Sequence, residues 1–380
     1  MRIAMVGLKG IPAKWGGIEK YVEEVGKRLV QRGHEVTVLG SSWYCKDHEE
    51  NSFEGMKIIR APTVHLQSTD ALSNALLSSV RVMFGGFDVV NFHGQASYYF
   101  LPFLRLSGRP CVVTVHTMAS GWDNPKYGPF ARSVIRFAFK TGVSYATRTV
   151  TVACHLQSKI KTDCGIDAEV LASGITKADY RQPRVIREKY GLGENDYLLY
   201  LGRIDPIKRV DWIVDLHKEV PPGLKIVIAG GAQDASASSY LEAAQRVCRS
   251  ARNVIFAGPV LGQEKEELLS NCLAVLAPSS EEGLPITVLE AASYGKCAIA
   301  SSIDAHREVL IDGRSGYLFA RDSREEFAEK VKSVVSLSVE ERNDVGMNAR
   351  ETVSERYDWD KTAARYEDIF MECTALRRSS

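Results

Sequence analysis

The chain has 380 residues, of which 45% are hydrophobic and 25% are charged, and its formal net charge is +1. This composition is typical of a soluble globular enzyme, and the length favours two domains over one. No apolar run approaches the roughly 18 to 20 residues that a membrane-spanning helix needs. The nearly neutral total charge gives no reason to expect a nucleic-acid partner.

The eight cysteines are scattered singly, without a CxxC pair. This pattern argues against a zinc site or a disulfide framework and favours a reducing compartment. The beginning of the chain, MRIAMVGLKG, reaches glycine too early for a secretory signal and predicts a first strand. We therefore expect a cytoplasmic protein.

The first half of the chain alternates short apolar runs with amphipathic segments. The runs are RIAMVGL, HEVTVLG, KIIRAP, DVVNFHG, CVVTVHT, TVTVAC and EVLAS. Between them we expect helices that include Ile18–Gln31, Ala71–Phe84 and Phe130–Ala146. Fully apolar strands separated by helices predict a parallel sheet that is covered on both faces.

The second half repeats this alternation with YLLYLGR, KIVIAGG, NVIFAGP, LAVLAPS, CAIASS and GYLFA. The fold class is therefore α/β, with two Rossmann-like, doubly wound domains over residues 1–178 and 179–355 and a last helical segment over 356–380. Ligands of such domains bind at the carboxyl ends of the strands, here expected to face a central cleft. The helices expected in this half include Tyr240–Ser250, Glu264–Asn271, Pro285–Tyr294 and Arg324–Val335.

Two carboxylates stand eight residues apart in EEGLPITVLEAASYG, directly after the expected strand LAVLAPS. Glu282 precedes the turn, and Glu290 lies more than one turn inside the following helix. The rise of a helix separates them by on the order of 10 Å, which matches a sugar, a diphosphate and a ribose laid end to end. One carboxylate is then expected to hold sugar hydroxyls and the other a ribose diol. A capping acid and an exposed helix acid would also fit this spacing.

The start of that helix is expected at Leu284 or Pro285, because proline suits the first helical turn. The unpaired amides of this turn, up to Ile286, predict a phosphate site at the positive end of the helix dipole. Gly283 would let the ligand approach the backbone closely.

With this Glu pair the sequence resembles the family 4 glycosyltransferases, whose signature is a Glu, seven residues and a second Glu. The resemblance spans nearly the whole chain. It implies the GT-B fold, a nucleotide-sugar donor and retention of anomeric configuration, with Glu282 near the donor sugar and Glu290 on the ribose. The stretch GLKGIPAKWGGIEKYV further resembles a bacterial rhamnosyltransferase-like subset that acts in polysaccharide biosynthesis.

A second match is YLLYLGRIDPIKRVDWIV, where a strand is expected to end at Gly202 and is followed by Arg203 and Lys208. Two cations at a strand end suit a diphosphate and its leaving charge. In the resembling family these positions clamp the donor phosphates, whereas a solvated basic loop is the alternative. The glycine that usually follows the lysine is Arg209 here.

The first domain offers two further candidates. Gly16 and Gly17 stand directly before an amphipathic helix whose first amides are expected to face a phosphate, although a plain turn would use the same glycines. His116 ends the strand CVVTVHT. A lone histidine there is more often structural, but the resembling family carries one near the reacting sugar. His93 is a weaker candidate of the same kind and is interpreted as structural.

Glycines also follow strands of the second domain, at Gly230, Gly231 and Gly258, the last in the run Gly-Pro-Val that ends at Val260. The resembling family binds the nucleotide base there, and a tight turn would explain these glycines equally well.

Asp358 and Asp360 match the Asp-x-Asp string with which sugar transferases of another fold bind a metal. These residues open the last helix, where aspartate is a typical helix-start residue, so we interpret them as a cap. In the resembling family this helix crosses back to the first domain. No metal and no other cofactor is expected.

The sequence therefore predicts a retaining, metal-independent glycosyltransferase for hexosyl or deoxyhexosyl groups. The donor would lie on the second domain, and a glycan, lipid-linked or small-molecule acceptor would enter from the first. One alternative is a nucleotide-sugar epimerase of the same fold, which would need no acceptor. The other is a non-catalytic sugar-nucleotide-binding subunit, which would have no reason to keep the Glu pair together with Arg203 and Lys208.

The charge is unevenly distributed between the halves. Residues 1–178 hold 21 Lys and Arg against 14 Asp and Glu, whereas residues 179–380 hold 27 against 33. In GPFARSVIRFAFKTGVSYAT, Arg132, Arg136 and Lys140 share one helix face beside large apolar residues. Such a stripe predicts peripheral contact with an anionic membrane, with an ordinary solvated face as the alternative. The apolar residues of this segment are Phe130, Val134, Ile135, Phe137 and Phe139.

Overall fold

The computed structural model describes residues 1–14, 16–45, 50–63, 69–118, 128–232, 235–248 and 251–378. The chain forms two compact units. Unit 1 comprises Met1–Gly174 and Trp359–Ser380, and unit 2 comprises Ile175–Asp358. The division therefore lies a few residues before the predicted boundary at 178 and a few residues after the one at 355. The last helix belongs to unit 1.

Unit 1 is built on an eight-stranded sheet with the order β3-β4-β2-β1-β5-β6-β7-β8, in which only the short β3 is antiparallel to its neighbour. The central strand pairs Ile3 with Val36 on one side and with Val89 on the other. The strands are β1 (Arg2–Val6), β2 (Glu35–Ser41), β3 (Ser52–Phe53), β4 (Met56–Ala61), β5 (Val89–Phe92), β6 (Cys111–Val115), β7 (Arg148–Thr151) and β8 (Glu169–Val170).

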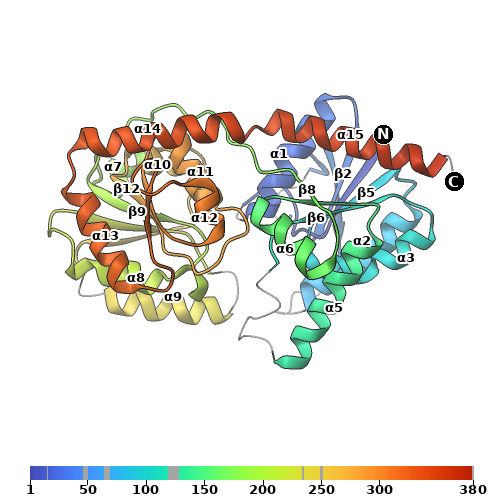
Figure 1. Cartoon of the computed structure of the whole chain (residues 1–380), viewed down its shortest axis with the longest axis horizontal. Helices are drawn as coiled ribbons and strands as arrows, with labels where there is room; N and C mark the ends of the chain where they lie inside the picture. Colours follow the sequence, from blue (N-terminus) through green and yellow to red (C-terminus); the bar gives the residue numbers. More distant parts are fainter. Residues whose placement is uncertain are drawn as a thin grey trace. The chain divides into compact units, whose positions relative to one another are not determined.

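Helices cover both faces of this sheet (Figure 1). One face carries α1 (Gly17–Gln31) and α15 (Trp359–Arg378), which pack together. Tyr21 on α1 joins them, because its hydroxyl lies 3.2 Å from that of Tyr366 and donates to the Leu171 carbonyl at 2.7 Å. The helices between β4 and β8 are α2 (Thr69–Phe84), η1 (Gln95–Phe100), α3 (Leu101–Leu106), α5 (Pro129–Tyr145) and α6 (Cys154–Cys164), of which α2, α3 and α5 lie on the other face.

Unit 2 has a six-stranded sheet, parallel throughout, with the order β11-β10-β9-β12-β13-β14. Nearly every residue of its central strands is fully buried, which explains their unbroken apolar sequences. The strands are β9 (Tyr197–Leu201), β10 (Lys225–Ala229), β11 (Val254–Gly258), β12 (Ala274–Ala277), β13 (Ala298–Ser301) and β14 (Tyr317–Phe319).

The helices of unit 2 also form two layers (Figure 1). Phe327 on α13 packs on Phe319 with ring centroids 5.0 Å apart, in a core that α8 and α9 share. On the other face α14 packs on α11. The helices are α7 (Val185–Tyr190), η2 (Pro206–Lys208), α8 (Val210–Asp215), η3 (Leu216–Lys218), α9 (Ala235–Cys248), α10 (Gly262–Asn271), α11 (Ile286–Ser293), α12 (Asp304–Val309), α13 (Arg324–Ser336) and α14 (Val339–Arg356).

The order of the strands fixes where a ligand site can form. The chain leaves β9 toward β10 on one side and later returns to β12 on the other side, so β9 and β12 are neighbours at a topological switch point. In doubly wound sheets, ligands bind at the carboxyl ends of the strands beside such a point. Unit 1 has the equivalent point between β1 and β5.

All eight cysteines are free thiols, and six of them are buried. Within the ranges that the structure describes, no helix combines the length and apolar character needed to cross a bilayer.

Candidate active site

The loops after β9 and β12 bring a lysine and a glutamate together. Lys208 ends the short helix η2, and its Nζ donates a hydrogen bond to Oε1 of Glu282, 74 residues further along the chain. The Ser279 hydroxyl donates to the same oxygen at 2.8 Å. The two loops are also tied through their backbones, because the amide of Ser280 donates to the Ile207 carbonyl at 2.8 Å. The pair therefore occupies the switch point of unit 2.

The surroundings of Glu282 keep it charged. Burial alone would raise the pKa of its carboxyl, but the positive charge of Lys208, the nearby His306 and the two hydrogen bonds outweigh burial, so its pKa lies below the ordinary 4.5. Only 18% of the Glu282 side chain and 13% of the Lys208 side chain are exposed. A charged pair that is this well covered interacts more strongly than a pair on the open surface.

The second glutamate has a separate partner. Glu290 lies inside α11 and accepts a hydrogen bond from Nζ of Lys265 on α10 at 2.6 Å. The carboxylates of Glu282 and Glu290 are thus paired with different lysines and are directed to different places. This arrangement agrees with the sequence-based expectation that they serve two ends of one ligand, an assignment that stays a prediction.

The helix after Glu282 begins later than predicted. Its first residue is Ile286, and Pro285 is the residue before the helix rather than part of its first turn. The amides of Ile286 and Val288 already donate to the carbonyls of Leu284 and Pro285, both at 2.9 Å. Fewer amides are consequently available to a phosphate than in a helix that begins at Leu284. The Thr287 hydroxyl donates to the Leu201 carbonyl at 2.9 Å and so fastens this terminus to β9.

The other cation of the predicted clamp, Arg203, is exposed directly after β9, which ends at Leu201 and not at Gly202. The Tyr200 hydroxyl donates to the Arg203 carbonyl and fixes the backbone there. Within the described ranges its guanidinium forms no ion pair, so the structure does not bring it to Glu282 as it brings Lys208. Its predicted role in binding phosphate remains a prediction.

Glycines line the ends of β9, β10 and β11. The amide of Gly202 donates to the Ala229 carbonyl at 3.0 Å, and the amide of Gly230 donates to the Gly258 carbonyl at 2.8 Å. A Cβ atom on Gly230 would lie 1.7 Å from the Gly202 carbonyl oxygen, so close backbone packing requires glycine at this position.

The remaining base-site candidates lie beside these glycines. A Cβ atom on Gly258 would meet no atom within 4 Å, although its φ of 71° favours glycine. The Gly231 carbonyl accepts the Ile204 amide at 3.0 Å, and Val260 is buried. Gly230 thus has a structural explanation, whereas Gly258 leaves open space beside a strand end.

In unit 1, the two histidines that follow β5 and β6 contact each other. Nδ1 of His93 lies 3.0 Å from Nε2 of His116, so one ring donates to the other. Burial lowers the pKa of His116 to about 3, and burial together with His116 lowers the pKa of His93 well below 6.5. Both imidazoles are therefore neutral at physiological pH. The ring of Tyr21 packs edge-on against His116 with centroids 5.0 Å apart.

The glycine loop before α1 also has an acidic neighbour. Gly17 is the first residue of α1, as the sequence predicted within one residue, and Gly16 precedes it with a φ of 108°. A Cβ atom on Gly16 would lie 2.3 Å from Oε2 of Glu19, whose Oε1 accepts the Lys9 amide at 3.1 Å. This buried carboxylate disfavours a phosphate at the first amides of α1, so a neutral ligand group suits the loop better.

The Asp-x-Asp string lies at the start of α15. The helix begins at Trp359, directly after Asp358, and Oδ1 of Asp360 accepts a hydrogen bond from Nε of Arg28 at 2.8 Å. The position matches the predicted helix start, and the ion pair gives Asp360 a structural partner on α1. No cluster of three or more potential metal ligands occurs in the described part of the chain.

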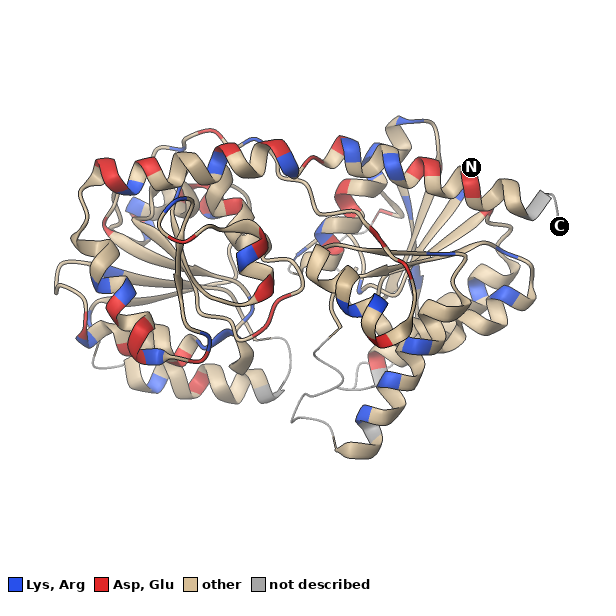
Figure 2. Ribbon diagram, viewed as in Figure 1, with Lys and Arg blue, Asp and Glu red and all other residues tan. Residues whose placement is uncertain are grey.

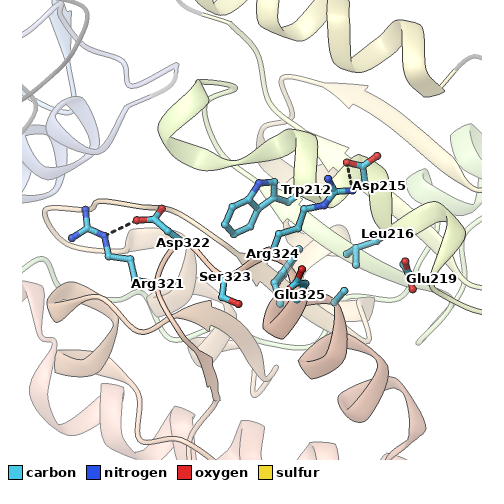
Figure 3. A pocket seen from close by; sticks show the side chains of 11 residues that line it. Trp212, Asp215, Leu216, Glu219, Arg321, Asp322, Ser323, Arg324 and Glu325 are labelled. Atoms are coloured by element: carbon cyan, nitrogen blue, oxygen red, sulfur yellow. Dashed lines mark ion pairs between the residues drawn. The ribbon is translucent and has the colours of Figure 1, made fainter.

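A surface cavity of about 600 Å³ lies elsewhere in unit 2 (Figure 3). It is lined by α8, η3 and the start of α13, with Trp212 beside the ion pair of Asp215 and Arg324, whose atoms are 2.6 Å apart. Neither Lys208 nor Glu282 lines it. We therefore locate the candidate active site at the switch point and not in this cavity.

Sequence reasoning missed several residues of the site. Ser279 and Lys265 hydrogen-bond the two glutamates, and His306 is fully buried near Glu282, where its Nδ1 lies 2.8 Å from the Ser301 carbonyl oxygen. Ser279 could have been found, because it follows the same strand as Glu282. Lys265 and His306 lie on other elements, and no local pattern distinguishes them from ordinary helix residues.

Two units built on largely parallel sheets, with candidate site residues just after the strands, agree with the GT-B fold expected from the sequence, and comparisons with known proteins support this. Residues 15–177 match the model of "Glycosyltransferase Family 4", and residues 183–352 match that of "Glycosyl transferases group 1". The chain belongs to the family 4 glycosyltransferases, which confirms the resemblance seen in the sequence. It is a glycosyltransferase that takes its sugar from a nucleotide-sugar donor.

The relatives and solved structures cover nearly the whole chain. The chain is 27% identical to a GDP-mannose-dependent alpha-(1-6)-phosphatidylinositol monomannoside mannosyltransferase of Mycobacterium tuberculosis, over 96% of this chain and 97% of that protein. It is 25% identical to a D-inositol 3-phosphate glycosyltransferase of Stackebrandtia nassauensis, over 88% and 84%.

Among solved structures, sucrose-phosphate synthase from Thermosynechococcus elongatus has a TM-score of 0.86 at 15% identity, with 99% of both chains covered. Anabaena HepE in complex with UDP and glucose has a TM-score of 0.81 at 16% identity, with 98% of this chain and all of that one covered. These likenesses confirm the predicted GT-B fold.

Proposed function

We propose that the protein is a retaining, metal-independent glycosyltransferase that moves a hexosyl or deoxyhexosyl group from a nucleotide sugar to a lipid-linked acceptor. The observation that carries the proposal is the convergence of Lys208 and Glu282 at the switch point of unit 2, with Glu290 held separately by Lys265. An amine and a carboxylate side by side suit the junction between the phosphate and the sugar of such a donor. Unit 2 then holds the donor and unit 1 the acceptor.

Lys208 and Glu282 form an ion pair whose two charges are already in place for the donor. Without a ligand, each charge neutralises the other, so neither is left unpaired at the strand ends. When the donor binds, the diphosphate attracts the lysine amine, and the released carboxylate accepts hydrogen bonds from sugar hydroxyls. Because the leaving diphosphate gains charge as the glycosidic bond breaks, a fixed cation there stabilises the transition state more than the bound donor.

The reaction at the anomeric carbon would pass through a state with oxocarbenium character. Retention without a second carboxylate in attacking position is explained if the acceptor oxygen adds on the face that the diphosphate leaves. The leaving phosphate oxygen then takes the acceptor proton, so no protein base is required. The neutral His116 suits this scheme, because an uncharged imidazole can contact a sugar hydroxyl without repelling the developing positive charge.

The acceptor proposal is supported by the relatives. The mycobacterial relative acts on a phosphatidylinositol monomannoside, and the Stackebrandtia relative on D-inositol 3-phosphate. GDP-mannose is accordingly the first donor to test, and nucleotide-linked deoxyhexoses such as dTDP-rhamnose are the second, because of the resemblance of the first glycine loop to rhamnosyltransferases.

The test is a panel of nucleotide sugars, read first by thermal shift and then by product analysis. A donor present at about 100 times its dissociation constant should add roughly 2.7 kcal/mol to the free energy of unfolding. The anomeric configuration of the product, read from its NMR coupling constants, should equal that of the donor. EDTA should leave the rate unchanged, and loss of activity that Mg²⁺ or Mn²⁺ restores would contradict metal independence. Isomerisation of the donor without acceptor would indicate an epimerase, and binding without transfer would indicate a non-catalytic subunit.

Unit 1 also presents a surface suited to a lipid acceptor. Along α5, Arg132, Arg136 and Lys140 recur every four residues, and this helix contains no Asp or Glu (Figure 2). Phe130 and Phe137 are 83% and 70% exposed. Phe139 was expected to add to the same apolar side, but it is fully buried, so the structure assigns it to the core.

A second apolar stripe lies on α2, which the sequence did not single out. Leu72, Leu76, Val80 and Phe84 recur every four residues and are between 47% and 80% exposed. On the neighbouring α3, Phe103 and Leu106 are 60% and 86% exposed, and α2, α3 and α5 share one face of the sheet (Figure 1).

The charges around these apolar residues are almost all positive. The three helices hold five Lys and Arg, and their single carboxylate, Asp70, accepts a hydrogen bond from the Trp43 ring nitrogen at 2.9 Å. Large exposed apolar side chains between cations fit the surface of an anionic bilayer, where each cation contributes about 1 kcal/mol. We infer that this face contacts an anionic membrane and brings the enzyme to its acceptor.

Sedimentation with vesicles of phosphatidylglycerol and phosphatidylcholine tests this contact. Wild type should pellet at low salt and be released partly at high salt, and Phe84→Ser and Arg136→Glu should each weaken pelleting. Leu261→Ser removes an apolar residue of unit 2 that is 56% exposed and is the control. Equal behaviour of wild type and both variants, or a stable dimer without vesicles that Phe84→Ser dissociates, would overturn the inference.

A further inference from the structure

Arg209 occupies a backbone position that favours glycine. It follows Lys208 directly, lies between η2 and α8, and has a φ of 52° and a ψ of 42°. Residues with a Cβ atom adopt this left-handed conformation at an energetic cost, whereas glycine adopts it freely. This geometry explains why the resembling family usually has glycine here. In this chain the position carries one of the longest side chains instead.

The side chain of Arg209 is held on two sides. Its Nη2 donates to Oδ1 of Asp322 at 2.8 Å, and its guanidinium carbon lies 5.2 Å from the ring centroid of Trp212, in a cation–π contact. Its Nε is buried and has no hydrogen-bond partner among the described residues. Asp322, between β14 and α13, also has a left-handed φ of 61°. The contact between Arg209 and Asp322 is thus accompanied by a left-handed backbone at both residues and by a buried Arg209 Nε–H without a hydrogen bond to any described residue.

The turn that Arg209 closes is the turn that presents Lys208. The Asp205 carboxylate accepts the Ile207 amide at 3.1 Å, and the amides of Lys208 and Arg209 donate to the carbonyls of Asp205 and Pro206 at 2.9 and 3.1 Å. On one side Ser280 ties the turn to the Glu282 loop. On the other side, Arg209 ties it to Trp212 and Asp322, two residues at the edge of the surface cavity (Figure 3).

We propose that Arg209 is a positioning residue. Its contacts with Asp322 and Trp212 hold the Lys208 amine in place for the donor diphosphate. The inference rests on the proposed function insofar as it concerns the diphosphate. The geometric part, that the side chain of Arg209 keeps the turn closed, stands without it. The alternative is an incidental surface ion pair, because 35% of the Arg209 side chain and 49% of that of Asp322 are exposed and such pairs contribute little.

The test compares Arg209→Gly and Asp322→Asn with Arg324→Gln. Glycine removes the side chain and also relieves the left-handed backbone, so a loss of function cannot be ascribed to new strain. Arg324→Gln is the matched control, because it breaks the ion pair with Asp215 that joins α8 and α13 beside the same cavity but does not touch the turn. Two readouts are used: amide hydrogen exchange over residues 203–212 without ligand, and affinity for UDP, GDP and dTDP by calorimetry.

Arg209→Gly should speed exchange in this segment and weaken the best-binding nucleotide by roughly fivefold, as expected for losing a partly exposed ion pair and a cation–π contact. Asp322→Asn removes the ion pair alone and should have a smaller effect in the same direction. The double variant should be no worse than Arg209→Gly, since both remove the same ion pair. In a Lys208→Ala background, Arg209→Gly should change the affinity no further. Arg324→Gln should match wild type.

Unchanged exchange and unchanged affinity in Arg209→Gly would overturn the proposal, and so would an equal loss in Arg324→Gln, which would indicate general loosening of α8 and α13. If wild type binds none of the three nucleotides, the proposed function fails. The exchange data then still decide whether Arg209 holds the turn.

Discussion

The two units share one architecture, but the side chains that meet at their strand ends are charged in unit 2 and neutral in unit 1. In unit 2, the loops after β9 and β12 hold the charged Lys208 and Glu282 in contact. In unit 1, the loops after β5 and β6 hold two neutral imidazoles, His93 and His116, 3.0 Å apart. A charged site suits a nucleoside diphosphate that must be bound and stabilised as it leaves, whereas a neutral site suits hydroxyl groups. If unit 2 binds the donor and unit 1 the acceptor, as proposed, the difference between the two sites lies in their charge and not in their fold.

We expect the largest loss of activity when the cations of unit 2 are removed. Lys208→Ala and Arg203→Ala should each slow sugar transfer by a factor on the order of 10² or more, because a preformed stabiliser of the leaving charge is lost. The measurement is kcat with saturating donor. Lys332→Ala, which removes a surface ion pair with Glu219, is the control. Wild-type turnover in Lys208→Ala would remove the basis of the donor assignment.

Substitutions of the two glutamates of unit 2 should affect the affinity for different parts of the donor. Glu290→Ala should weaken both the nucleotide sugar and the free nucleoside diphosphate, by roughly 10-fold to 10²-fold if hydrogen bonds between the carboxylate and the ribose are lost. Glu282→Ala should weaken the complete nucleotide sugar and hardly affect the free nucleoside diphosphate. Titration calorimetry with both ligands distinguishes the two. Equal losses for both ligands in both variants would mean that the ends are assigned wrongly.

The neutral pair of unit 1 is tested by His116→Ala. Transfer should fall on the order of tenfold through misplacement of the acceptor, while affinity for the nucleoside diphosphate stays at the wild-type value. His93→Gln, which keeps a polar group beside His116, should cost less than His116→Ala. A change in nucleotide affinity instead of transfer would place His116 on the donor side.

We expect a smaller effect on how the free energy of unfolding depends on pH. Burial lowers the pKa values of His93 and His306 below the ordinary 6.5, the latter in spite of the nearby Glu282. Below about pH 6.5 the unfolded chain therefore binds protons that the folded chain does not, so the free energy of unfolding falls with falling pH. The slope is up to about 1.4 kcal/mol per pH unit for each imidazole.

Urea unfolding at pH 7.5, 6.0 and 5.0 measures this slope. His93→Gln should flatten it, because the substitution removes one of the imidazoles whose pKa burial lowers. A slope that is the same in His93→Gln and wild type would show that His93 titrates alike in the folded and unfolded chains.

Much of the fold and some of the site could be predicted from the sequence, because both depend on local patterns. Apolar runs between amphipathic segments identified the strands of both sheets except the short β3, and the helices at α2, α5 and α13 were expected within two residues of their observed bounds. Lys208 and Glu282 were found because each lies just after a strand. The start of α11 was placed too early, since Pro285 suits a first turn but here only precedes it.

Pairings between distant segments could not be predicted. No periodicity links Lys265 to Glu290 or His93 to His116, and the contact of Arg209 with Asp322 spans 113 residues. The exposed stripe on α2 was missed for a related reason. Its apolar residues would suit a buried face equally well, and only the packing of α2 leaves them uncovered.

The fold class, the family and the positions at which polar residues follow strands can be read from the amino-acid sequence, because they depend on the order of residues along the chain. Which of those residues meet, and in which state of charge, depends on the folded structure. The contact of Lys208 with Glu282 depends on β9 and β12 being neighbours, and the low pKa of His116 depends on the side chains that enclose its ring. Both are properties of packing, in which groups far apart in sequence share one dry environment.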